Sequence, residues 1–155
     1  MKLVNYLRPE YIGIGIEARS KDDLIEKMVD LAAKNPKVYD KDKVFAAIIE
    51  RERIMSTGVG KGFAIPHGKS DAVGEIVLAF GVTKEPVDYA SMDNEPVSLV
   101  LLLVSRDQDV GLRLKLLSRA SKVMNSDTAR EAFLKATSPE EVMEIFRAEE
   151  EKIGD

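Results

Sequence analysis

Residues 56–70 are Ser-Thr-Gly-Val-Gly-Lys-Gly-Phe-Ala-Ile-Pro-His-Gly-Lys-Ser, and they hold the only histidine of the chain, His67. Glycines at positions 58, 60 and 62 predict a tight turn or hairpin, and the apolar run 63–65 predicts a short strand. Pro66 ends this strand, because proline cannot donate a hydrogen bond to a neighbouring strand. We therefore expect His67 at the mouth of a strand, between a rigid proline and a flexible glycine.

A single imidazole can serve as a base, a metal ligand or a nucleophile, because its ordinary pKa is about 6.5. A cysteine–histidine pair is excluded, since the chain has no cysteine, and no Gly-x-Ser-x-Gly elbow presents a serine nucleophile. A zinc site usually takes several histidine or cysteine ligands, so we predict no metal site. General base and nucleophile remain as roles for His67, and a purely structural histidine is the alternative.

The glycine-rich segment Gly58–Gly62 differs from the known phosphate-binding loops. It matches neither Gly-x-x-x-x-Gly-Lys-Ser/Thr nor Gly-x-Gly-x-x-Gly, and a strand follows it where those motifs have a helix. The helix N-terminus that binds phosphate in those motifs is therefore missing. We predict neither nucleotide binding nor an organic cofactor.

The remaining sequence predicts an α/β fold. The apolar runs 76–82 and 97–104 are typical of strands buried on both faces, and residues 11–17 predict a further strand. Capping residues predict helices after Ser20, Asp40 and Ser138, with two more between the last strand and Ser138. We expect one domain over residues 1–155, a three-layer α/β/α arrangement with a mixed sheet of four or five strands. The acidic run Glu149–Glu151 is expected to be solvated.

Composition restricts the partners. The net charge is −4 with 32% charged residues, which argues against nucleic acid as a partner. No apolar run approaches the roughly 20 residues that span a bilayer. The first residues lack the apolar core of a signal peptide, and the absence of cysteine gives no support to a secreted protein. We therefore expect a cytoplasmic protein.

Several motifs together resemble one protein family. Glu50-Arg51-Glu52, then Ser56-Thr57-Gly58, then Ala64-Ile65-Pro66-His67-Gly68 resemble the signature of the fructose/mannitol-type EIIA proteins of the bacterial phosphotransferase system, which include a nitrogen-regulatory group. The resemblance spans nearly the whole chain and implies the same three-layer fold. It also implies a phosphotransferase in which Nε2 of His67 accepts a phosphoryl group from phospho-HPr. A IIB component of a sugar-uptake system would receive that group, so contact with a membrane permease would be peripheral at most.

Further site residues follow from phosphoryl chemistry, which needs positioning and charge neutralisation. Arg51 and Arg113 are the predicted cations, backbone amides near Gly58 and Gly68 the predicted donors, and Ser56 or Thr57 the predicted hydroxyl.

Arg113 is a departure from the family, because it occupies the position where these proteins commonly carry a second histidine. An arginine cannot shuttle a proton at neutral pH, although it can hold a phosphoryl group. Two alternatives therefore stay open: a regulatory EIIA that binds a partner according to its phosphorylation state, and a non-catalytic relative that binds anions or partners.

Overall fold

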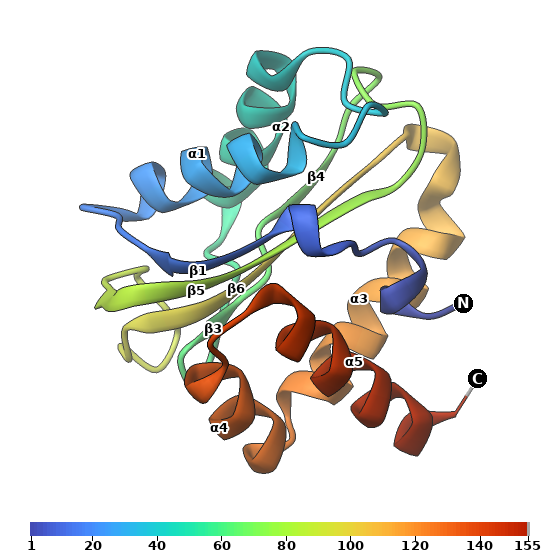
Figure 1. Ribbon diagram of the computed structural model, residues 1–155. Coiled ribbons are helices and arrows are strands. Elements are labelled where there is room, and N and C mark those ends of the chain that lie inside the picture. Colours follow the sequence, from blue (N-terminus) through green and yellow to red (C-terminus); the bar gives the residue numbers. More distant parts are fainter. Residues whose placement is uncertain (155) are drawn as a thin grey trace.

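Six strands form one mixed sheet in the computed structural model, which describes residues 1–154 (Figure 1). The order is β1-β5-β6-β3-β2, and β4 also pairs with β6, farther along that strand than β3. The central strand β6 runs antiparallel to β5 and parallel to both β3 and β4. The strands are β1 (Ile12–Ile16), β2 (Gly58–Gly60), β3 (Phe63–Ala64), β4 (His67–Lys69), β5 (Val77–Val87) and β6 (Val97–Ser105).

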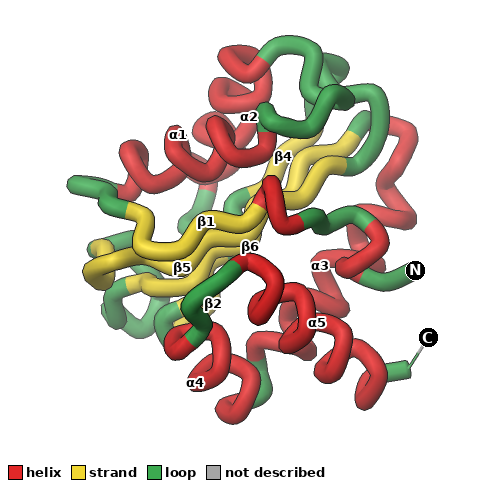
Figure 2. Tube along the Cα trace, viewed as in Figure 1, coloured by secondary structure: helices red, strands yellow, loops and turns green. Residues whose placement is uncertain are grey.

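Helices cover both faces of the sheet, as Figure 2 shows in red and yellow. One face carries α1 (Lys21–Ala32) and α2 (Lys41–Ile54). The other carries α3 (Val110–Met124), α4 (Asp127–Lys135) and α5 (Pro139–Ile153). Short 3₁₀ turns lie at Leu3–Asn5, Pro9–Tyr11 and Asp107–Asp109. The predicted α/β/α class is therefore confirmed.

Sequence signals explain where the helices begin. The side chains of Ser20, Asp40, Ser126 and Ser138 accept hydrogen bonds from backbone amides two or three residues later, so each caps a helix, and three of these caps were expected. The two apolar runs form the long strands β5 and β6, whose side chains feed two hydrophobic cores, one on each face. No helix within residues 1–154 is long and apolar enough to cross a membrane.

Two expectations need correction. The sheet has six strands where four or five were expected, because residues 56–70 contribute three short strands. The acidic run near the C-terminus was expected to be solvated, but Glu150 is fully buried. Its carboxylate accepts hydrogen bonds from the backbone amides of Leu3 (2.8 Å) and Val4 (3.0 Å) and from Nε of Arg119 (2.8 Å). The N-terminal turn and α3, both distant in sequence, supply the donors that allow this burial.

Candidate active site

The glycine-rich segment forms the hairpin that the sequence predicts. Strands β2 and β3 pair antiparallel, and the turn between them uses positive φ angles at Lys61 (59°) and Gly62 (79°). Strand β3 ends at Ala64, as expected from Pro66, but the chain then resumes as β4. His67 is the first residue of β4 and lies opposite Leu103 of β6. The histidine is thus fixed to the central strand of the sheet.

The imidazole of His67 is half-buried, and a hydrogen bond fixes its orientation. Nδ1 lies 2.8 Å from the backbone oxygen of Ile65. Because a carbonyl oxygen can only accept, Nδ1 carries the hydrogen, and the lone pair of the neutral ring lies on Nε2. Burial lowers the pKa of His67, and the positive charges of Arg51 and Arg113 lower it further, against opposing effects of the Ile65 hydrogen bond and Glu52. The ring is therefore neutral at pH 7.

A pocket of about 350 Å³ opens beside this ring. Residues of α2, β4 and α3 surround it: Ala47, Glu50, Arg51, Ile54, His67, Gly68, Lys69 and Arg113. Its charged residues comprise three cations and one carboxylate, so the pocket favours an anion. A side chain at Gly68 would place its Cβ only 3.2 Å from the backbone oxygen of Ala47, which explains the glycine where β4 passes α2.

The two arginines are each anchored by one hydrogen bond. Nη1 of Arg51 donates to the backbone oxygen of Met55 (2.9 Å), and Nη1 of Arg113 donates to Oγ of Ser105 (2.8 Å). A guanidinium has five N–H donors, so each arginine keeps further donors for an anion. The structure thus brings Arg51, Gly68 and Arg113 to the pocket of His67, in agreement with their grouping from the sequence.

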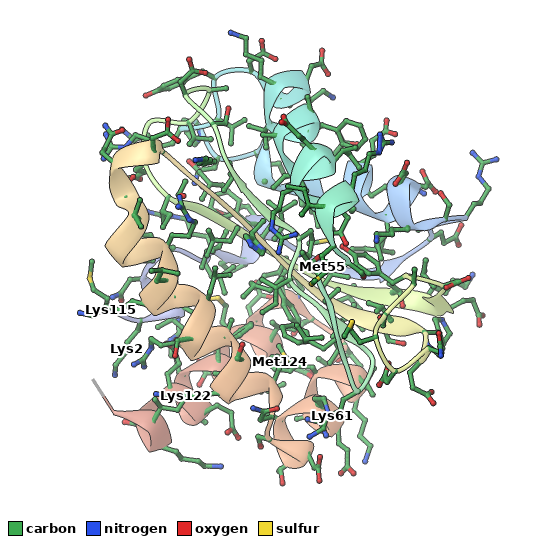
Figure 3. The ribbon with its side chains drawn as sticks, turned by 180° about the vertical axis from the view of Figure 1, so that it is seen from behind. Lys2, Met55, Lys61, Lys115, Lys122 and Met124 are labelled. Carbon is green, nitrogen blue, oxygen red and sulfur yellow. The ribbon has the colours of Figure 1, made fainter. Side chains whose placement is uncertain are left out.

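Ser56, Thr57 and Gly58 do not line this pocket; their polar groups bond within the protein. Oγ of Ser56 donates to the backbone oxygen of Tyr89 (3.2 Å) and accepts from the amide of Gly58 (3.1 Å). The hydroxyl and amide of Thr57 both donate to Glu52. Figure 3 shows Lys61 at the far tip of the hairpin. Met55, which follows the pocket-lining helix α2, lies near the middle of the same view.

Sequence reasoning missed two residues of this region, and each had a usable signal. Lys69 lines the pocket, and its spacing of two from His67 in a strand places both side chains on one face. Glu52 is only 5% exposed. Val44, Ile48 and Glu52 are spaced four residues apart in α2. Because residues four apart lie on one side of a helix, this spacing predicts that Glu52 shares the buried face of Val44 and Ile48.

Comparisons with known proteins agree with this architecture. Residues 5–149 match the family model described as the phosphoenolpyruvate-dependent sugar phosphotransferase system, EIIA 2. The chain is 33% identical over 137 residues to the fructose-specific EIIA component of Haloferax volcanii, covering 88% of this chain and 89% of that one. It is 34% identical over 146 residues (94% of this chain) to the fructose-specific EIIABC component of Bacillus subtilis, of which it spans 23%.

A solved structure gives the same result. The nitrogen regulatory protein IIA-Ntr of Neisseria meningitidis superimposes with a TM-score of 0.87 at 32% identity, covering 93% of this chain and 98% of that one. Both the sugar-specific and the nitrogen-regulatory branches are thus similar to this protein, which confirms the resemblance noted in the sequence. The chain belongs to the EIIA type 2 family of the phosphoenolpyruvate-dependent sugar phosphotransferase system.

Proposed function

We propose that this protein is a phosphohistidine carrier. His67 accepts a phosphoryl group from phospho-HPr and passes it to a IIB component of a sugar-uptake system. The observation that carries the proposal is the hydrogen bond from Nδ1 to the backbone oxygen of Ile65, which leaves the lone pair on Nε2 beside a cationic pocket. A neutral, oriented imidazole is what nucleophilic attack on phosphorus requires.

The transfer step balances without a metal or cofactor. Nε2 of His67 attacks the phosphorus in line, and the bond from phosphorus to the donor imidazole breaks as the new N–P bond forms. Nδ1 keeps its hydrogen, so the positive charge of the protonated phosphoimidazole ring passes from the donor to His67. The backbone oxygen of Ile65 accepts the hydrogen bond from this cationic ring and stabilises it.

The pocket supplies charge for the phosphoryl oxygens. Arg51 and Arg113 keep free N–H donors beside the ring. Nζ of Lys69 lies 3.8 Å from Asp107, in an exposed ion pair that is easily exchanged for another anion. Charge-assisted hydrogen bonds of this kind are the strong ones in phosphate recognition.

Apolar side chains beside the pocket fit a protein donor. Ile54, Met55 and Leu114 are 78%, 60% and 61% exposed. Exposing large apolar side chains to water is unfavourable, so a group of them is typical of an interaction surface. A protein that delivers a phosphoryl group from its own histidine needs such a surface to bring the two rings together. We infer that these residues contact the donor and the acceptor in turn, and that the reaction takes place in the cytoplasm.

A regulatory role is the second candidate. Arg113 at the position of a second histidine and the similarity to a nitrogen regulatory protein both favour it. In that case the phosphorylation state of His67 would control binding of a regulated protein. A non-catalytic relative is a weaker alternative, because Arg51, Pro66, His67 and Gly68 are all present.

Incubation with phosphoenolpyruvate, enzyme I and HPr, followed by intact mass measurement, tests the proposal. The protein should gain one phosphoryl group that is labile in acid and stable in base, and His67→Ala should gain none. A second EIIA protein in the same mixture confirms that the donors are competent. An unchanged mass in that mixture would refute the phosphocarrier function.

A further inference from the structure

We propose that Glu52 is a positioning residue for His67 and acts through Thr57 and Ile65. It touches neither the ring nor the pocket, yet a continuous chain of hydrogen bonds joins its carboxylate to the imidazole. This inference rests on the proposed function for its meaning in catalysis, while its structural content can be tested without phosphoryl transfer.

Glu52 is a buried carboxylate with all of its oxygen positions occupied. Oε2 accepts from the amide of Thr57 (2.7 Å) and from Nζ of Lys21 (2.9 Å). Oε1 accepts from the hydroxyls of Thr57 (2.5 Å) and Tyr89 (3.1 Å). A carboxylate with 5% exposure persists only with such partners, because an unpaired buried charge is very costly. Two of its four donors belong to Thr57, so Glu52 fixes that residue.

Thr57 passes this constraint to the residue that holds the imidazole. Its backbone oxygen accepts from the amide of Ile65 at 3.0 Å, and the backbone oxygen of Ile65 accepts from Nδ1 of His67 at 2.8 Å. On the other side, the backbone oxygen of Pro66 accepts from the amide of Leu103 at 3.0 Å. The Ile65–Pro66 peptide, which has no N–H of its own, is therefore held from both sides.

The consequence concerns which nitrogen of His67 carries the hydrogen. While Ile65 is fixed, its oxygen keeps the hydrogen on Nδ1 and the nucleophilic lone pair on Nε2. If Thr57 is released, this oxygen shifts and the ring samples the other tautomer, in which Nε2 carries the hydrogen and cannot attack. The negative charge of Glu52 also favours the protonated ring, against Arg51 and Arg113.

Tyr89 reinforces the same cluster from a distant part of the sequence. Its side chain is fully buried, and its hydroxyl contacts both Glu52 and Thr57 (3.1 Å each). Burial and the nearby Glu52 charge raise the pKa of Tyr89, so the hydroxyl remains a donor throughout the useful pH range. Lys21 lies over its ring, 4.7 Å from the centroid. Loss of Glu52 therefore removes the shared acceptor of four donors, which come from Lys21, Thr57 and Tyr89.

Nitrogen NMR of the imidazole reads this effect directly, because His67 is the only histidine. At a pH above the pKa of His67, the wild-type protein should show hydrogen on Nδ1 alone. Glu52→Ala should show a mixture of tautomers, and its rate of phosphorylation by phospho-HPr should fall about 100-fold, the usual cost of a displaced reactive group. Glu52→Gln should stay near the wild type, since its amide oxygen can accept from Thr57 and Lys21 while its NH₂ donates to the two hydroxyls.

Glu150→Ala is the matched control. Glu150 is also a buried carboxylate with three donors, but it lies on the opposite face of the sheet. This variant should lose stability while the His67 tautomer and the phosphorylation rate stay at wild-type values. If Glu52→Ala does not fold, Thr57→Val removes one bond of the same chain and should give a smaller shift of the same kind.

A folded Glu52→Ala, or Thr57→Val where the first does not fold, with a wild-type tautomer and a wild-type rate would overturn the inference. A wild-type protein that accepts no phosphoryl group would instead refute the proposed function. In that case the tautomer measurement alone still decides whether Glu52 positions His67.

Discussion

Arg113 donates a 2.8 Å hydrogen bond to Oγ of Ser105, which is the fully buried last residue of β6. The bond joins the first turn of α3 to the end of the central strand, and β4 with His67 pairs to that same strand. The guanidinium is therefore held at the pocket instead of moving freely in solvent. A fixed cation beside the ring should favour the phosphorylated state over the free one.

The first prediction is that Arg113→Ala shortens the lifetime of phosphorylated His67 about tenfold, the value of one charge-assisted contact of about 1.5 kcal/mol. Arg113→His should transfer the group to a IIB partner faster, because a neutral ring holds the phosphoryl oxygens less strongly. Loss of the phosphorylated mass with time, with and without IIB, measures both. If lifetime and phosphorylation rate are unchanged in Arg113→Ala, Arg113 has no role in binding the group.

The second prediction follows from the lowered pKa of His67. The folded protein binds the proton less readily than the unfolded chain, whose histidine titrates near 6.5. The unfolded state therefore takes up a proton first as the pH falls, and the wild type loses stability below about pH 6.5. Urea unfolding at several pH values should show this loss relative to His67→Gln, with the two proteins running parallel at higher pH. Parallel curves across the whole range would contradict the lowered pKa.

The third prediction concerns the buried ion pair of Arg119 and Glu150. Glu150→Ala leaves the guanidinium without its carboxylate and two backbone amides without an acceptor, so the free energy of unfolding should fall by about 3–5 kcal/mol. The neighbouring Glu151 is exposed, and Glu151→Ala should change stability by no more than about 0.5 kcal/mol. Equal effects of the two substitutions in urea unfolding would show that the ion pair contributes nothing.

These residues show what sequence could and could not predict. The strands β5 and β6 follow from apolar runs, and the helix starts follow from capping side chains, because both signals are local. Pro66 and Gly68 are also local signals, because they flank His67 directly and predict its place at the end of a strand. Glu150 was misjudged because its partners lie about 31 and 147 residues away in the chain. No local pattern reveals such donors, so an acidic run looks solvated when one member of it is buried.

The site shows the same division between local and distant information. Arg51, Gly68 and Arg113 were grouped with His67 from the sequence, and the structure brings them to one pocket. Ser56, Thr57 and Gly58 lie in the same motif, but their donors bond to Glu52, Tyr89 and one another. Nearness in sequence to His67 grouped these residues with it, but the direction of their polar side chains depends on distant partners such as Tyr89.

The last prediction concerns docking. Ile54 ends α2, lines the pocket and is 78% exposed, so a protein partner that approaches His67 covers it. Removing an isoleucine side chain completely from water contributes about 1.5–3 kcal/mol, and partial burial at an interface contributes a share of this. Ile54→Gln removes this apolar surface without changing the charge and should raise the KM for phospho-HPr about fivefold, with little change in kcat.

Leu134→Gln is the control, because Leu134 is 53% exposed on α4, which packs on the opposite face of the sheet from α2. It should keep a wild-type KM, and both variants should unfold within about 0.5 kcal/mol of the wild type. A KM unaffected by Ile54→Gln, or raised equally by Leu134→Gln, would place the docking surface away from the end of α2.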